Sequence, residues 1–390
     1  MGMKYRVHKN AVIFFGLFSF FVFTAVPAAF AQSPGPIEAI EPGVTPPEKF
    51  YRAEVLEVYQ AERENVPGYL QKVEIVKLKI ASGDEKGKEV EAESLNYSQS
   101  LSNCEAFKLT RGEKVLVGKL QNLDEPFYYI ADKYRLPYLF IIFVSFLAVA
   151  LGLGRLRAFT SIVGLIFSIF MLAVFIVPSI LEGRNPLLVS LAGAFVIAIV
   201  SLFLAHGFNK RAAVALFSTL ITLSIAAGLS YTFVIFSKLF GLSSEEAFYL
   251  QAFPGANINL QGLLIGAIII GTLGVLDDVT VTQVAAVEEI GRADSSLSTA
   301  ELYKRGLSIG HEHIAALINT LALAYAGVSL PLFVLFTLSG SQPLWVILNG
   351  ELVAEEVVRT LVGSIAIILA VPISTFLAAY FLRSKVPEKH

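Results

Sequence analysis

Two adjacent carboxylates, Asp277 and Asp278, interrupt a run of residues that is otherwise uncharged from Gly262 to Val287. An acidic residue at mid-membrane costs roughly 2.5–3.5 kcal/mol on insertion scales, and such a residue usually marks a functional site. Carboxylate and hydroxyl oxygens suit hard cations such as Mg²⁺, Ca²⁺ or Mn²⁺, and a desolvated acid binds and releases a proton. The sequence therefore predicts a cation or proton site at these acids and the polar residues after them, Thr280, Thr282 and Gln283.

On a helix the two acids point about 100° apart. Asp278 shares its face with small residues at helical spacing, namely Ala267, Gly271 and Gly274. Because a stripe of small residues lets a neighbouring helix approach closely, we expect Gly271 and Gly274 to be packing residues. Asp278 is then expected to face a helix contact or a water-filled cavity. The alternative is that both acids lie near the cytoplasmic mouth of the span and are solvated.

A second polar stripe lies within residues 310–327, where small and polar residues recur at spacings of three and four: Glu312, Ala315, Asn319, Ala322 and Ala326. We expect this stripe to pack on the first and to close a carboxylate–amide–hydroxyl pocket that includes Asn319 and Thr320, with Gly327 in the helix contact. The alternative is that these polar side chains only hydrogen-bond across a helix interface, which contributes about 0.6 kcal/mol each.

Accessory candidates flank this stripe: His311, Glu312, His313 and Tyr325. The triplet is not H-E-x-x-H, whose histidines share one helix face, because His311 and His313 are turned about 200° apart. Whether a metal binds is left open, and one histidine is as readily a helix cap or the partner of an acid. No G-x-S-x-G motif lies near the histidines and the sequence has no Walker loop, so we expect neither an enzyme nor a bound cofactor.

Composition indicates an integral membrane protein. Hydrophobic residues make up 55% of the 390 residues, charged residues 16%, and the mean hydropathy is +0.66, whereas soluble domains carry about 25% charged residues. The balance of 30 basic and 32 acidic residues argues against nucleic-acid binding, and a single cysteine, Cys104, excludes an intramolecular disulfide. Seven apolar segments are long enough to span a bilayer: 137–153, 157–180, 185–207, 212–239, 258–284, 313–337 and 356–382.

The chain before these segments divides into three parts. Residues 1–31 carry basic residues, an apolar run and an A-x-A site, which predicts a signal peptide or, if uncleaved, an anchor helix. Residues 32–49 form a Pro/Gly-rich linker. Residues 50–135 alternate polar and apolar positions between turn signals, typical of a small β domain of the OB or SH3 barrel type. A transmembrane helical domain over 136–384 and a tail over 385–390 complete the predicted organisation.

The distribution of basic residues predicts an orientation. With the β domain outside, ten basic residues lie in the inner loops and tail, and three lie at the outer ends of the spans: Arg155, Arg157, Lys210, Arg211, Arg292, Lys304, Arg305, Arg383, Lys385 and Lys389 against Arg184, Lys238 and Arg359. We therefore expect a bacterial inner or plasma membrane protein with an extracytoplasmic β domain and a cytoplasmic carboxyl terminus.

Two segments resemble signature stretches of the YibE/F family of bacterial multispan proteins: G-T-L-G-V-L-D-D-V-T-V-T-Q at 271–283 and N-T-L-A-L-A-Y-A-G at 319–327. The resemblance covers the chain after the linker and implies an exported β domain followed by membrane spans. The family generally reads G-R-D or G-R-E before the sixth span, where this chain has Gly310-His311-Glu312. The resemblance implies an architecture rather than an activity.

Taken together, the residues favour a secondary transporter or channel-like permease that handles a cation or proton at the acidic pair. The alternative is a non-transporting membrane anchor, scaffold or signalling module whose exported β domain binds a partner. The expected partners are the lipid bilayer and a small cation or proton, and we expect no nucleic acid. The protein could form a homo-oligomer or bind a partner subunit.

Overall fold

The computed structural model describes residues 48–66, 69–93, 108–120, 126–252, 258–338 and 343–382. The signal segment 1–31, most of the linker, Cys104 and the tail 385–390 lie outside the described residues. The chain divides into two compact units, one of residues 36–150 and one of residues 1–35 and 151–390.

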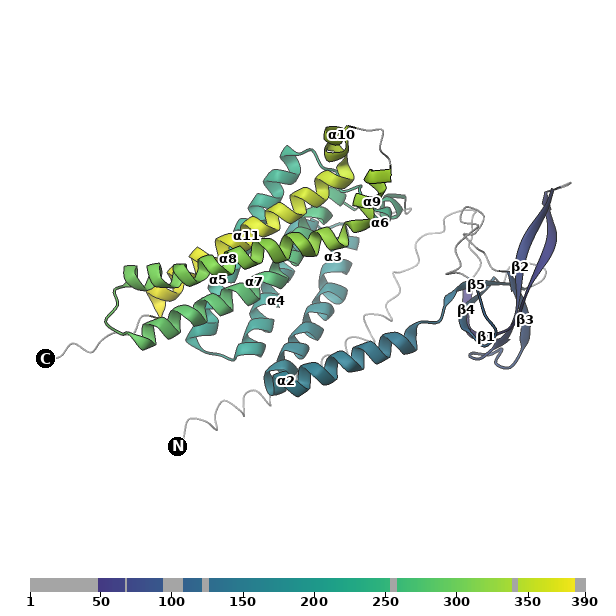
Figure 1. Ribbon diagram of the computed structural model, residues 1–390, viewed down its shortest axis with the longest axis horizontal. Coiled ribbons are helices and arrows are strands. Elements are labelled where there is room, and N and C mark those ends of the chain that lie inside the picture. Colours follow the sequence, from purple (N-terminus) through teal and green to yellow (C-terminus); the bar gives the residue numbers. More distant parts are fainter. Residues whose placement is uncertain are drawn as a thin grey trace. The chain divides into compact units, whose positions relative to one another are not determined.

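Five strands form the first unit: β1 (Glu48–Val66), β2 (Tyr69–Ile80), β3 (Glu89–Glu93), β4 (Lys114–Leu120) and β5 (Phe127–Lys133). They close a barrel in the order β1-β2-β3-β5-β4, drawn in purple and blue in Figure 1. Alternate residues point inward, so that Ala53, Val55, Val76 and Leu78 are buried. The predicted β domain is confirmed, and its five-stranded closed barrel fits the OB type. The strand pairs are antiparallel except one, since β5 runs parallel to β3 where the barrel closes.

The turn between β2 and β3 carries an acid that ties two other strands to it. The Glu85 carboxylate accepts a hydrogen bond from Lys119 of β4 and another from Tyr128 of β5, each at 2.6 Å. Desolvation opposes ionisation of Glu85, but these two bonds and the positive charges of Lys119 and Lys88 together outweigh it, so its pKa lies below the ordinary value. The turn is therefore held to the barrel by a charged carboxylate.

The neighbouring Asp84 makes the stability of the barrel depend on pH. Hydrogen bonds from the Lys49 ammonium and the Tyr51 hydroxyl, each 2.9 Å long, lower the pKa of Asp84 to about 2, against about 3.9 in an unfolded chain. Because the folded pKa is the lower one, the contribution of Asp84 is complete above about pH 4 and is lost as the pH falls towards about 2. We expect amide hydrogen exchange in β1–β5 of the full-length protein, corrected for the intrinsic rate, to accelerate over this range. An Asp84→Asn variant should show a smaller acceleration, and equal curves for both proteins would contradict the prediction.

The described part of the second unit is helical. Its first helix, α2, begins within the residues of the first unit. The bounds of the helices are α2 (Leu136–Met171), η3 (Leu172–Ile176), α3 (Val177–Leu181), α4 (Pro186–His206), α5 (Lys210–Phe236), α6 (Glu245–Ala252), α7 (Leu260–Ala293), α8 (Thr299–Val328), α9 (Leu330–Leu338), α10 (Leu344–Asn349) and α11 (Glu351–Phe381).

Five helical segments of the described chain are long and apolar enough to cross a membrane, or six when the bent pair α8–α9 is counted as one span. The sequence predicts seven. Part of the difference arises at the first segment, Leu136–Leu181, which is counted once although the non-helical backbone of Arg155, with φ of 51°, divides it into two helices across a kink. Arg155 falls between the first two predicted spans, 137–153 and 157–180. A second difference concerns the predicted span 313–337. The helix there, α8, begins earlier, at Thr299, and bends by 61° before α9.

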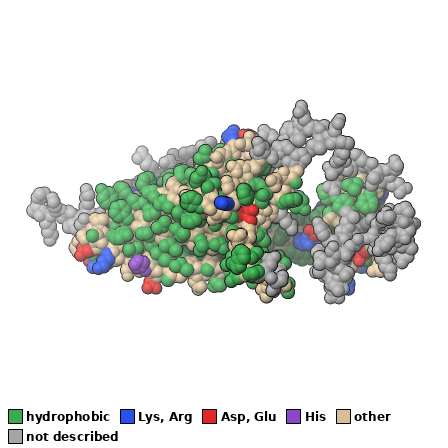
Figure 2. Space-filling model, turned by 90° about the horizontal axis from the view of Figure 1, so that it is seen from above, with side chains coloured by type: hydrophobic (Ala, Val, Ile, Leu, Met, Phe, Trp, Pro, Cys, Tyr) green, Lys and Arg blue, Asp and Glu red, His purple; other side chains and the backbone are tan. Residues whose placement is uncertain are grey.

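Helix α7 is central in the second unit, where it contacts α4, α5, α8 and α11. Its buried residues Ile269, Leu276 and Val279 belong to the largest apolar cluster. Hydrophobic side chains also cover the outside of the helices, and Figure 2 shows few charged side chains among them on this face. A helical unit that is apolar both inside and outside is what a lipid environment requires, so the chain is a membrane protein.

Candidate functional site

Three asparagines set where the helices around the site begin. The Oδ1 atom of Asn185 accepts a hydrogen bond from the backbone N–H of Leu187, that of Asn209 from Ala212, and that of Asn259 from Gly262, at 3.0, 2.8 and 2.9 Å. These bonds satisfy N–H groups that have no partner within the helix. The starts of α4, α5 and α7 are thereby fixed, and with them the depth of each polar side chain along the bundle.

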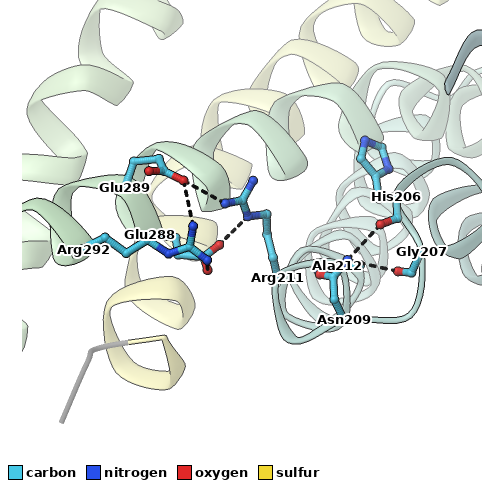
Figure 3. Close-up of polar contacts among 8 residues, drawn as sticks. All are labelled: His206, Gly207, Asn209, Arg211, Ala212, Glu288, Glu289 and Arg292. Atoms are coloured by element: carbon cyan, nitrogen blue, oxygen red, sulfur yellow. Dashed lines mark hydrogen bonds and ion pairs between the residues drawn. The ribbon is translucent and has the colours of Figure 1, made fainter. Parts of the chain in front are cut away.

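At the opposite end of α7, an ion-pair network fixes α5 against α7 (Figure 3). Arg211, in the first turn of α5, binds the Glu288 carboxylate through Nε and Glu289 through Nη2, the latter at 3.0 Å. Arg292, also on α7, pairs with the same two carboxylates at 2.6 and 3.3 Å. Two cations thus meet two anions, and Glu288 is only 15% exposed. The network holds the register between α5 and α7 in which the site is built.

Asp277 lies between α7 and α4 with one oxygen satisfied and one free. The Ser201 hydroxyl of α4 donates to Oδ2 at 3.1 Å, while Oδ1 is buried and has no hydrogen-bond partner among the described residues. Asp277 is about 27 Å along α7 from Asn259, at a rise of about 1.5 Å per residue. No ion pair of the described residues includes it. A buried carboxylate with a free oxygen and no cationic partner has a high free energy when it is charged. Binding a proton or a cation lowers that free energy.

The structure corrects the expectation for Asp278, which is exposed at the surface of the helical unit. Gly271 and Gly274 on the same face have no atom within 4 Å of where a Cβ would stand, so they are not packing residues within the chain. Thr282 is exposed as well. The two acids point about 100° apart, and the neighbouring helices cover the direction of Asp277 but not that of Asp278. Helices α4 and α5 pack on the Asp277 face, and α7 continues through the glycines without a break.

The other two predicted residues on α7 lie inside the bundle. The Thr280 hydroxyl is 2.8 Å from the hydroxyl of Thr219 on α5, and both side chains are fully buried. The Gln283 amide donates to the Gly306 carbonyl of α8 at 2.9 Å and to the Thr375 hydroxyl of α11 at 2.7 Å. Gln283 therefore joins three helices, and Thr280 joins a fourth.

Ser201, Thr219 and Thr375 were not among the predicted site residues. Most buried hydroxyls in these helices bond only the carbonyl four residues earlier in their own helix, as Ser218 and Thr222 do. In the sequence a hydroxyl that bonds across helices has the same appearance as one that bonds within its helix. The contact between helices is the only signal, and it exists only in the folded chain.

The second predicted stripe also faces outward. Asn319 and Thr320 are exposed, and the Thr320 hydroxyl bonds the Ala316 carbonyl of its own helix at 3.0 Å. The expected pocket between the stripes is wrong, because α8 meets α7 at Gly306 and Gly310, in its first half, and not at Asn319 and Thr320. There the absence of side chains lets the helices approach, whereas the space beside Gly327 is open.

The accessory candidates do not gather around Asp277. His311 and Glu312 are exposed, and His313 is partly buried with an Nε2 atom that has no partner among the described residues. The hydroxyl of Tyr325 lies 3.6 Å from where a Cβ of Gly363 would stand, in the contact between α8 and α11. In the described part of the chain, three or more His, Cys, Asp or Glu side chains nowhere come together as a metal site.

The packing role of Gly310 gives a testable contrast. A Cβ at Gly310 would lie 2.3 Å from Val371 and 3.1 Å from the Gln283 amide nitrogen. We expect Gly310→Ala to destabilise the protein by about 1–3 kcal/mol through overpacking. Gly274→Ala meets no atom and replaces glycine inside a helix, so it should be neutral or stabilise by up to about 1 kcal/mol. Thermal unfolding in detergent measures both, and equal effects of the two substitutions would contradict this assignment.

A family model described as YibE/F-like protein matches residues 140–384, which cover the described helices from within α2 to α11. The match leaves the five strands of the barrel outside it. Neither a curated protein nor a solved structure matches the chain significantly.

Proposed function

The chain belongs to the YibE/F-like protein family, and from this premise we propose that it is a membrane protein that carries protons across the bilayer by way of Asp277. The observation that supports the proposal most directly is the free, buried Oδ1 atom of Asp277 within a helix long and apolar enough to span a membrane. An ionisable group at that depth without a cationic partner is costly to keep unless it serves a purpose.

The surroundings of Asp277 favour a proton over a hard cation. Ca²⁺ takes about 6–8 oxygen ligands, and Mg²⁺ requires a near-octahedral set. Asp277 offers one carboxylate, and the described residue bonded to that carboxylate is Ser201. A proton needs only the carboxylate oxygen itself, and the Ser201 hydroxyl accepts or donates a hydrogen bond as the acid changes its charge.

The distribution of Lys and Arg along the chain also bears on its location. We propose that the protein lies in a bacterial inner or plasma membrane, with the β barrel on the extracytoplasmic side and the carboxyl terminus in the cytoplasm. The excess of Lys and Arg in the predicted inner loops supports this orientation. In that orientation the Arg211–Glu288 network is at the cytoplasmic end of the bundle.

Reconstitution of the full-length protein tests the proposed activity. Liposomes that contain the protein and an entrapped pH-sensitive dye should acidify or alkalinise faster than protein-free liposomes when a potassium diffusion potential is imposed. If the protein is only an anchor or scaffold, the two rates will be equal at every protein density, and that result would remove the transport proposal.

A further inference from the structure

A second acid is buried where α11 begins, at a different level of the bundle from Asp277. Glu355 is only 3% exposed. Its Oε2 atom accepts a hydrogen bond from the Ser243 hydroxyl, and its Oε1 atom has no partner among the described residues. Glu355 bonds Ser243 in the loop that contacts Leu260 at the start of α7, and it is about 6 Å along α11 from the first residue of that helix, Glu351. Asp277 is about 27 Å along α7 from Asn259, at the same start of α7. The two free carboxylate oxygens therefore belong to separate sites.

A fixed loop holds a second carboxylate next to Glu355. Glu351 lies one helical turn before Glu355, on the same face of α11. The backbone N–H of Phe240 donates to Glu351 at 2.6 Å, so both acids bond the loop between α5 and α6. This loop is seated on the start of α7, because a Cβ at Gly241 would lie 2.5 Å from the Leu260 carbonyl oxygen. The loop and α11 form a built site rather than a loose acidic surface.

The charges around this site do not balance. The first nine residues of α11 contain three acids, Glu351, Glu355 and Glu356, and one base, Arg359. Arg359 pairs with Glu356 at 3.4 Å. Glu351 and Glu355 take part in no ion pair of the described residues, so two negative charges are left without a bonded cation.

We propose that Glu355, Glu351 and the Ser243 hydroxyl bind a hard divalent cation at this end of the bundle. Two carboxylates and a hydroxyl supply the oxygen ligands that Ca²⁺, Mn²⁺ and Mg²⁺ prefer, and water molecules complete the coordination. Binding here does not depend on the activity of Asp277. The further step, that this cation is the substrate whose movement the proton at Asp277 drives, rests on the proposed function.

The single tryptophan of the chain, Trp345, provides a probe close to the site. It lies on α10, which ends at Asn349, directly before Gly350 and α11. Mn²⁺ quenches tryptophan emission at short range, so titration of the purified full-length protein in detergent with Mn²⁺ should give saturable quenching that Ca²⁺ reverses. Glu355→Gln keeps the shape of the side chain and should raise the half-saturating Mn²⁺ concentration at least about tenfold, which corresponds to about 1.4 kcal/mol.

Three variants make the result specific. Glu351→Gln should also weaken Mn²⁺ binding, and it replaces Glu355→Gln if that variant does not fold. Glu182→Gln, an exposed acid already paired with Arg184, should leave the titration unchanged. Asp277→Asn should leave Mn²⁺ quenching unchanged while it abolishes proton flux, which separates the two proposals. Quenching that does not saturate, or that is the same in the wild type, Glu355→Gln and Glu351→Gln, would overturn the cation site.

Discussion

Asp277→Asn is expected to reduce proton flux to the rate of protein-free liposomes. Asparagine has nearly the same shape as aspartate and keeps an oxygen that accepts the Ser201 hydrogen bond, so the contact between α7 and α4 should survive. The amide cannot bind and release a proton at the pH of the assay. Dye-loaded proteoliposomes under an imposed potential measure the flux, and size-exclusion chromatography with thermal unfolding shows whether the variant is folded.

Asp278→Asn is the matched control for this experiment. It removes the same charge one residue away, at a position exposed on the outside of the helical unit. We expect it to retain most of the flux. Ser201→Ala should slow the flux without abolishing it, because the serine stabilises the carboxylate but does not carry the proton. Loss of flux in Asp278→Asn with normal flux in Asp277→Asn would assign the site to the other face of α7.

The sequence indicates the chemistry of the site better than its geometry. Adjacent acids in an uncharged run identify a polar region on α7, and the structure brings Thr280 and Gln283 from that region into the bundle. Which acid faces inward was predicted incorrectly. In an ordinary amphipathic helix the apolar side identifies the buried face, but a helix in lipid is apolar on both sides. The small residues beside Asp278 therefore carried no information about which face α4 and α5 would cover.

The fold was predictable where local rules decide it. Alternation of polar and apolar residues predicts strands within residues 50–135, and β1 to β5 extend from Glu48 to Lys133. Hydropathy identifies the long helices, because a span must exclude charge over about 20 residues. The bend between α8 and α9 depends on packing and backbone conformation that composition does not encode. The pairing of helices is likewise decided by contacts among side chains that look alike in the sequence.

Gln283→Ala is expected to have the largest effect on the stability of the helical unit, about 3 kcal/mol. Gln283 is 3% exposed and bonds the Gly306 carbonyl and the Thr375 hydroxyl. Alanine removes both donors, leaves the Gly306 carbonyl without this bond and opens a space between α7, α8 and α11. Thermal unfolding of the full-length protein in detergent, followed by circular dichroism, measures the loss.

Thr282→Ala is the control, since Thr282 is the neighbouring residue on the exposed side of the same helix turn, and a surface change of this kind is usually within about 0.5 kcal/mol. Thr375→Val tests the network from α11. It removes one of the two acceptors of Gln283 but leaves the other, so it should cost less than Gln283→Ala. If Gln283→Ala and Thr282→Ala had equal effects, the three helices would be held by their apolar contacts alone. A large effect confined to Gln283→Ala would instead mean that the polar residues after Asp277 serve the architecture, and that Asp277 is the member of the segment left free to exchange a proton.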